Sequence, residues 1–356
     1  MTPYWLILGI GIIGSLFERP RVLSTRVPVL PVMIFAMVII ALFVGLRYQI
    51  GTDWYTYLVY YVDVSRLDIR GAVEYGDPAY TLLNWLSSRL DFHIWFVNLA
   101  CAIIFCAGLY VFASGQTRPW LTLTASIPYL IIAVAMGYTR QSAAIGLVLV
   151  GLHFLLRRQG VVTFLVFSVL AATMHKSALM IVPIALAPLV WRKWWAIPLG
   201  LAVGAAGYFL LLRDELSALF DLYIASEYDS AGALIRVGLT AVPAAIFVAA
   251  SSRMRMPVVE REIWLSLSLF SLAMVPAVLL SPSTTAIDRL GLYLIPVQLI
   301  TISRIPDLLG GSEASSKTAL FACLAYCAGI QFAWFSVGAY TYAWVPYYNY
   351  LQIWLR

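Results

Sequence analysis

The strongest constraint on this chain is a succession of long apolar runs, separated by short polar segments. Of its 356 residues 62% are hydrophobic and only 11% are charged, whereas a soluble domain carries about 25% charged residues. Lipid offers the backbone no hydrogen bonds, so apolar runs of this kind cross a bilayer as helices. Because the runs are continuous rather than alternating, they exclude a closed β-barrel. The sequence predicts an all-α, polytopic membrane protein, with a single membrane domain over residues 1–356.

Up to twelve runs qualify as spans, but several are shorter than the ~20 residues that a bilayer core requires. We therefore expect about 10–12 transmembrane helices. The runs cover residues 4–17, 27–46, 93–112, 119–136, 141–156, 161–174, 177–190, 195–212, 236–250, 263–280, 290–305 and 318–338. The pair 161–174 and 177–190 could form one long helix or a broken, re-entrant pair.

The orientation follows from the positive-inside rule, by which Lys and Arg gather in cytoplasmic loops. If the amino terminus lies outside, the inside loops hold 13 of the 23 basic residues, and 12 of the 17 acidic residues lie outside. The two main extracytoplasmic loops then cover residues 47–92 and 213–236. In the first loop, four leucines that follow Pro78 share one helical face, which predicts an amphipathic helix in the membrane interface. They are Leu82, Leu83, Leu86 and Leu90.

Charged residues first appear where the apolar run 27–46 ends. The sequence there turns polar and aromatic in one step, with Arg47 and Asp53 beside Tyr48 and Trp54. A membrane-surface belt would explain the aromatic residues, since Trp and Tyr collect at headgroup level. It explains less well a Gly-Thr-Asp turn that follows an arginine, so we interpret the segment as part of a functional site.

Three more charged groups lie at span ends on the same, outer side of the expected topology. They are Arg140 with its neighbour Tyr138, the pair His175 and Lys176, and the pair Asp288 and Arg289. Ionisable residues at such positions are costly and usually serve a substrate or a partner. For the last pair, a structural ion pair or a loop cap is an equal alternative.

Taken together, these groups suggest a lipid diphosphate sugar as the ligand. Arginine binds phosphate oxygens through two parallel hydrogen bonds, and aromatic side chains stack on sugars. The predicted substrate-binding residues are Arg47, Arg140, Arg289, Lys176, Tyr48, Trp54, Tyr138 and Asp288. His175 is a candidate general base, because the ordinary pKa of histidine is about 6.5. Asp53 is the rival base, or it could orient the base or stabilise an oxocarbenium-like centre.

No metal or other cofactor is expected. The three histidines are scattered, and the four cysteines lie inside apolar runs without the spacing of a metal site.

The motifs that carry these residues resemble the EpsG family of bacterial exopolysaccharide polymerases, which are Wzy-like integral membrane proteins. The resemblance covers five segments in order: residues 45–57 (GLRYQIGTDWYTY), 77–84 (DPAYTLLN), 139–144 (TRQSAA), 175–179 (HKSAL) and 288–293 (DRLGLY). Two positions depart from the family pattern. Family members usually have Glu-Pro where Asp77-Pro78 stands, and often Asn in place of Tyr138.

The resemblance implies an activity and a location. Wzy-like polymerases join oligosaccharide repeat units carried on undecaprenyl diphosphate, at the outer face of the bacterial cytoplasmic membrane. The expected partners are therefore an undecaprenyl-diphosphate-linked glycan donor and acceptor, membrane lipid and a chain-length regulator protein, with no nucleic acid. By analogy the resemblance also implies a GT-C-like helical fold that works without a tightly bound metal.

Two other functions remain open at this stage. An O-antigen ligase-type transferase would use the same donor with another acceptor, but such ligases usually have a long outer loop late in the chain. A lipid-linked sugar flippase or transporter commonly has twelve spans and paired repeats. We find no such repeats here, and the longest outer loop is the first, so the polymerase is favoured.

Overall fold

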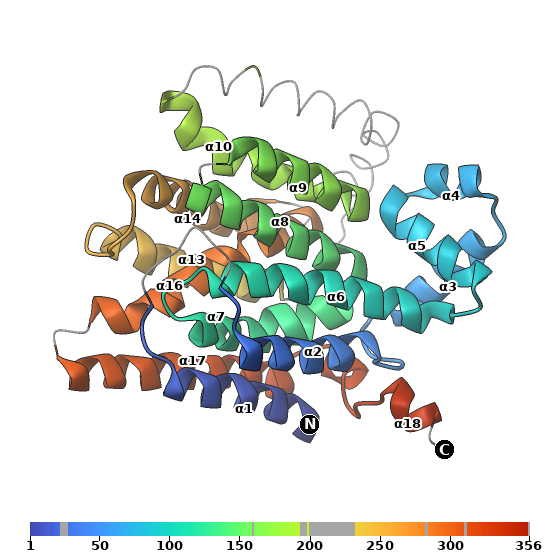
Figure 1. The fold of residues 1–356 in the computed structure, drawn as a ribbon, viewed down its shortest axis with the longest axis horizontal. Coiled ribbons are helices and arrows are strands. Elements are labelled where there is room, and N and C mark those ends of the chain that lie inside the picture. The colour runs from blue at the N-terminus through green and yellow to red at the C-terminus, as the bar shows by residue number, and fades with distance from the viewer. Residues whose placement is uncertain are drawn as a thin grey trace.

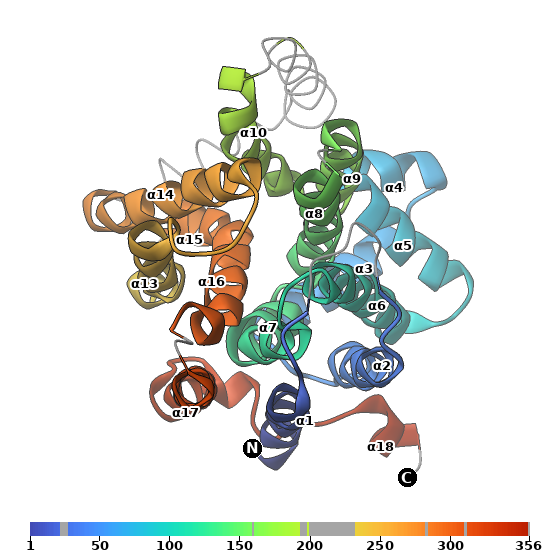
Figure 2. The same cartoon turned by 60° about the vertical axis from the view of Figure 1, so that its left-hand side comes forward.

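The structure, a computed structural model, describes residues 1–21, 28–158, 160–192, 198, 232–281, 284–309 and 312–354. Within these ranges the chain is a bundle of helices, and the all-α prediction is confirmed. Most of the long helices run side by side along the horizontal axis of Figure 1 and are seen nearly end-on in Figure 2.

The first half of the chain supplies most of the helices on one side of the bundle. Its elements are α1 (Thr2–Phe17), α2 (Pro31–Gly45), α3 (Trp54–Ser65), α4 (Ile69–Tyr75), α5 (Pro78–Arg89), α6 (His93–Ser114), α7 (Pro119–Ser126), the π-helix η1 (Ile127–Ala135), α8 (Thr139–Arg158), α9 (Val161–Met174), the 3₁₀ helix η2 (Lys176–Met180) and α10 (Ile181–Arg192). The second half adds α13 (Ala233–Ala250), α14 (Val258–Leu280), α15 (Thr285–Gly291), η5 (Leu292–Leu294), α16 (Ile295–Leu308), α17 (Glu313–Val337), η6 (Thr341–Ala343) and α18 (Tyr350–Trp354).

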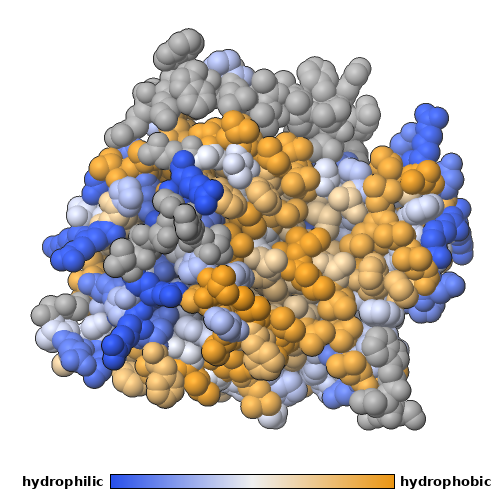
Figure 3. Space-filling view, viewed as in Figure 1, coloured by the Kyte–Doolittle hydropathy of each residue, from blue (hydrophilic) through white to orange (hydrophobic). Residues whose placement is uncertain are grey.

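Five of the described helices, α6, α8, α13, α14 and α17, are long and apolar enough to cross a membrane. Five shorter apolar segments accompany them: α1, α2, Pro119–Ala135, α9 and Lys176–Val190. Figure 3 shows hydrophobic side chains over the middle of the molecule and hydrophilic ones towards both ends. The chain is therefore a multi-pass membrane protein. Each expected span coincides with helical structure except 195–212, which lies almost wholly outside the described residues.

The pair of expected spans 161–174 and 177–190 is broken and does not form one long helix. His175 ends α9 with extended backbone angles (φ −160°, ψ 116°), and a short 3₁₀ turn precedes α10. The break places His175 and Lys176 in a turn, where their polar groups face other segments of the chain.

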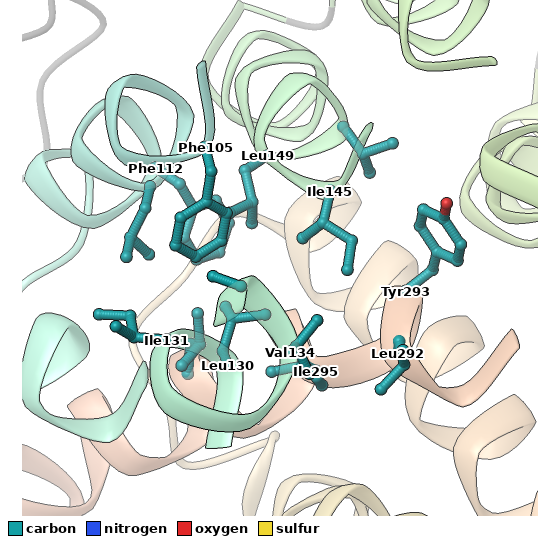
Figure 4. Packing of buried hydrophobic residues seen from close by; sticks show 14 of the residues in the cluster. Phe105, Phe112, Leu130, Ile131, Val134, Ile145, Leu149, Leu292, Tyr293 and Ile295 are labelled. Atoms are coloured by element: carbon teal, nitrogen blue, oxygen red, sulfur yellow. The ribbon is translucent and has the colours of Figure 1, made fainter. Parts of the chain in front are cut away.

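The close contact between α6 and α8 sets the position of the amino end of α8. A Cβ atom added to Gly108 would collide with the Gly146 carbonyl, so the two backbones touch. Small residues allow membrane helices to approach in this way. Beside this contact, Phe105 and Ile145 pack towards residues of η1 and the α15–α16 region, as Figure 4 shows.

The segment near the carboxyl end holds the turn that follows α2. Tyr48 N–H donates to the Tyr348 carbonyl at 3.0 Å, and Gly51 N–H donates to the Ala343 carbonyl at 3.0 Å. Gly51 has φ +102°, and a Cβ there would lie 2.7 Å from the Met136 carbonyl oxygen. This turn therefore requires glycine on both conformational and steric grounds.

The expected outer loop 47–92 folds into three helices, α3 to α5, grouped at the right-hand end of Figure 1. Pro78 is the first residue of α5, as expected. The far part of the leucine face of α5 points away from the protein, with Leu86 44% and Leu90 49% exposed, whereas Leu83 packs against the core. Its opposite face packs inwards through Tyr80, Thr81, Asn84 and Ser87. An outward leucine face suits a helix in the membrane interface. Of the expected loop 213–236, residues 213–231 lie outside the described part of the chain.

Candidate functional site

A small polar cavity of about 270 Å³ lies beside the α3–α5 group. Segments far apart in the chain meet around it: the turn before α3, α3 itself, the start of α8, the break between α9 and η2, and α15. Its lining residues are Asp53, Thr56, Tyr57, Tyr138, Arg140, Gln141, His175 and Arg289. Five of the predicted site residues, Asp53, Tyr138, Arg140, His175 and Arg289, are therefore brought together.

Arg140, in the first turn of α8, is held by an acid and a cage of aromatic rings. Its Nη1 lies 3.1 Å from Asp77 Oδ2. The guanidinium carbon lies 5.4–5.9 Å from the ring centroids of Tyr57, Tyr60 and Tyr80. Cation–π contacts of this kind favour the charged group at these distances. The aromatic cage and Asp77 therefore fix the guanidinium at the cavity wall.

Asp77 is a site residue that the sequence interpretation missed. It is buried, and it contacts Arg140, His175 Nδ1 at 3.6 Å and the Lys176 N–H at 3.2 Å. Burial alone would raise the pKa of this carboxyl group, but its contacts with His175, Arg140 and the Lys176 N–H outweigh burial and lower the pKa. The available signal was its position: an acid directly before Pro78, in one of the segments that resemble the EpsG family.

His175 turns one ring nitrogen to Asp77 and leaves the other for the cavity. The 3.6 Å between Nδ1 and Asp77 Oδ2 is slightly longer than a hydrogen bond. Burial lowers the pKa of His175 below its ordinary value. Asp77 opposes this shift, whereas the positive charges of Arg140 and Arg289 add to it. The ring is therefore neutral at pH 7, and Nε2 is the nitrogen that can accept a proton from a ligand.

Asp53 also lines the cavity, directly before α3. Burial raises the pKa of its carboxyl group, and the positive charges of Arg289 and Arg140 and a hydrogen bond from Thr52 (3.3 Å) partly offset this. Arg289 comes from α15, whose position is fixed in part by a hydrogen bond from Gln141 Nε2 to the Arg289 carbonyl at 2.8 Å. Asp53 and His175 thus line the same cavity from distant parts of the chain.

Arg47 does not line the cavity. Its side chain is fully buried and donates to the Val44 carbonyl and to Thr139 Oγ1, both at 2.7 Å. These bonds join the end of α2 to the first residue of α8, next to Arg140. The structure therefore gives Arg47 a positioning role where the sequence suggested contact with a diphosphate.

The remaining predicted residues also lie behind the cavity wall. Tyr48 packs edge-on against Trp54 and against Tyr350, with ring centroids 5.8 Å and 5.1 Å apart respectively. The Asp288 carboxylate accepts two hydrogen bonds from Arg236, at 2.6 and 2.9 Å, which join α15 to α13. Lys176 contributes its backbone N–H to Asp77 rather than lining the cavity.

Possible metal ligands do not gather in the part of the chain that the structure describes. No group of three or more His, Cys, Asp or Glu side chains there is arranged to hold a metal ion.

The fold and the cavity define a multi-pass helical membrane protein with a small, charged site at one end of its bundle. Residues 31–349 match the EpsG family, and the chain belongs to that family. The match includes every segment that lines the cavity. Membership implies an exopolysaccharide-polymerase-like function. No curated protein and no solved structure matches the chain.

Proposed function

We propose that this protein is a polysaccharide polymerase, a GT-C-like glycosyltransferase that joins oligosaccharide repeat units carried on undecaprenyl diphosphate. The observation that carries the proposal is one cavity in which two arginines, a neutral histidine and a carboxylate converge. Arginines suit the leaving diphosphate, and the histidine suits the hydroxyl group that attacks.

Arg140 and Arg289 are the groups that would hold the diphosphate. Guanidinium groups bind phosphate oxygens in bidentate fashion and stabilise the negative charge that grows on the leaving group. The cavity, at about 270 Å³, lies near the lower end of the ~300–1,000 Å³ range of small-ligand pockets. It therefore suits the reacting end of a large substrate, with the glycan and the lipid extending beyond it.

His175 is our choice for the general base. Its Nδ1 faces Asp77, so the ring is oriented with Nε2 towards the cavity, and its lowered pKa keeps it unprotonated at neutral pH. Asp53, whose charge interacts with that of Arg289, would then stabilise an oxocarbenium-like sugar rather than take the proton.

The reaction follows from these roles. The acceptor hydroxyl oxygen attacks the anomeric carbon of the donor glycan while its proton passes to His175 Nε2. The bond between that carbon and the phosphate oxygen breaks, and its electron pair leaves with the lipid diphosphate. Arg140 and Arg289 stabilise this charge. Because the lipid diphosphate is already an activated leaving group, no nucleotide sugar is needed.

We place the site at the extracytoplasmic face of the cytoplasmic membrane. The support is the charge of the opposite end of the bundle, where Arg118, Arg157 and Arg253 lie with other basic residues. Such residues concentrate on the cytoplasmic side.

The test is reconstitution of the purified protein in proteoliposomes with a lipid-linked repeat unit. We expect a ladder of longer glycans and release of lipid diphosphate, and Arg289→Gln should lower the rate by about 10²-fold or more. Arg70→Gln is the matched control, because Arg70 lies in α4 near the site but is 85% exposed and bonded only to Glu74.

The outcome also separates the rival functions. A single transfer to a different acceptor without extension would indicate a ligase. Movement of the lipid-linked unit across the bilayer, with no new glycosidic bond, would indicate a flippase. Either result would overturn the polymerase assignment.

A further inference from the structure

A second charged cavity lies at the end of the bundle opposite the α3–α5 group, on the left in Figure 1. It measures about 1210 Å³ and lies between the end of α1, the start of α7, the loop from α13 to α14, the end of α16 and the start of α17. Seven basic side chains line it against three acidic ones. They are Arg19, Arg21, Arg118, Arg253, Arg255, Arg304 and Lys317, against Glu18, Asp307 and Glu313.

The three acidic side chains already have partners. Asp307 accepts two hydrogen bonds from Arg118, at 2.7 and 3.0 Å. Glu313 pairs with Lys317 at 2.7 Å. Glu18 accepts the backbone N–H groups of Trp120 and Leu121 at 2.8 and 2.9 Å. Asp307 and Glu313 are thus paired with other basic side chains, and Glu18 is held by backbone donors, so within the described part of the chain none of these acids forms an ion pair with the remaining arginines.

Four exposed arginines in the wall have no carboxylate partner among the described residues. They are Arg19, Arg21, Arg253 and Arg255. They come from two separate segments, one after α1 and one between α13 and α14. A cavity that gathers charges of one sign from different segments attracts a ligand of the opposite sign.

The inner wall adds a further positive charge. Arg304 is buried and shares the carboxylate of Glu260 with Arg157, at 3.0 and 2.8 Å, so one negative charge serves two guanidinium groups. Arg304 Nη1 also donates to Gln116 Oε1 at 3.1 Å, but its Nε has no hydrogen-bond acceptor. Buried polar atoms are normally paired, so this guanidinium at the cavity wall has hydrogen-bonding capacity that the described residues do not use.

The same cavity has an apolar wall, which identifies the kind of anion. Leu16 and Phe17 at the end of α1 line it, and Phe17 is 85% exposed. Met254, Leu308 and Leu320 also line the cavity. A small soluble anion gains nothing from such a wall, whereas an anion attached to an acyl chain gains contacts with both the arginines and the apolar residues.

We propose that this cavity binds the phosphate headgroup of an anionic membrane lipid, with its acyl chain along Leu16 and Phe17. Basic residues scattered around a membrane-facing belt would meet headgroups one at a time. Here they share one cavity with a buried, incompletely bonded arginine, and a bound lipid would connect the ends of α1 and α16 to the α13–α14 loop. The site does not depend on the polymerase assignment.

The experiment measures lipid binding to the detergent-purified full chain by native mass spectrometry, with added phosphatidylglycerol or phosphatidylcholine. We expect wild-type protein to bind phosphatidylglycerol preferentially. Each basic residue near an anionic lipid contributes about fivefold in affinity, so the double substitution Arg253→Gln with Arg255→Gln should weaken binding roughly 30-fold. The control is Arg158→Gln with Arg261→Gln, at the same end of the bundle but outside the cavity wall.

Further arms distinguish the lipid from other anions. Inorganic phosphate alone, or a polyglutamate peptide, should displace the lipid weakly. If either bound as well as the lipid, or if both double variants bound phosphatidylglycerol like wild type, the lipid site would be overturned. Size-exclusion chromatography of every variant checks folding, and no readout uses polymer formation, so failure here is distinct from failure of the proposed function.

Discussion

Replacing Asp77 by asparagine removes a buried charge at the site while keeping the shape of the side chain. The carboxylate lies 3.1 Å from Arg140 Nη1 and 3.6 Å from His175 Nδ1, and accepts the Lys176 N–H at 3.2 Å. The asparagine oxygen can still accept from Lys176, so the start of η2 should persist. The amide cannot neutralise Arg140, however, and it attracts the Nδ1 proton of His175 much less.

The two losses should differ in size. Removing one partner of a buried ion pair costs about 3–5 kcal/mol of folding free energy. The Arg140 side chain is 29% exposed and keeps its aromatic cage, so solvent and the rings reduce the expected cost to about 2 kcal/mol. Loss of a correctly held general base lowers the rate by about 10²–10⁴-fold. We therefore expect a folded protein with a much lower kcat.

The assay is release of lipid diphosphate in proteoliposomes, with KM and the thermal midpoint measured on the same samples. Because Asp77 raises the pKa of His175, the acid limb of the pH profile should move to lower pH in the asparagine variant. Asp77→Glu keeps the charge and should retain most activity. An asparagine variant with wild-type kcat and pH profile would refute the reasoning.

Three further substitutions or conditions test the site and its scaffold. Arg47→Gln loses two buried, charged hydrogen bonds and should cost about 3 kcal/mol in stability, seen as a lower thermal midpoint. Arg70→Gln, at a side chain that is 85% exposed, should leave that midpoint nearly unchanged. An Arg47 variant as stable as wild type would contradict the positioning role. The pKa of His175 in the folded protein lies below its unfolded value of 6.5. Activity, and the contribution of His175 to stability, should therefore be full above pH 6.5 and fall as the pH drops through the lower, folded pKa. Activity that rises on acidification would exclude a histidine base. Gly108→Val should push α6 from α8 at Gly146 and abolish folded protein on size-exclusion chromatography, whereas Gly329→Ala, with open space around it, should not.

The helices could be placed from the sequence because lipid imposes a local rule. Each apolar run must satisfy its own backbone hydrogen bonds, so hydrophobicity alone indicates a helix, and Pro78 marks a start because it lacks an N–H. The direction of a helix face is a different matter. Leu86 and Leu90 of α5 are exposed, whereas its polar face packs inwards. The polar groups of that face bond mainly to carbonyls of α5 and its cap, as Thr81 and Asn84 do, so they can be buried without a partner on another helix.

The site was predictable in part for the same reason. A charged residue at the end of a span is costly wherever it lies, so Arg140, His175 and Arg289 stood out without any knowledge of their neighbours. Whether such a residue faces a ligand or another side chain depends on which helices meet around it. Arg47 satisfies its charge on Val44 and Thr139 inside the protein, as Asp288 does on Arg236.

The sequence alone was sufficient to establish an apolar helical bundle with charged residues at the ends of its spans. Only the tertiary structure joined Asp77, Arg140 and His175, from α5, α8 and the end of α9, into one contact group. The physical reason is range. Hydrophobic spans and helix starts are decided within about 20 residues of chain, whereas the partner of a buried charge is decided by packing between segments that the sequence leaves far apart.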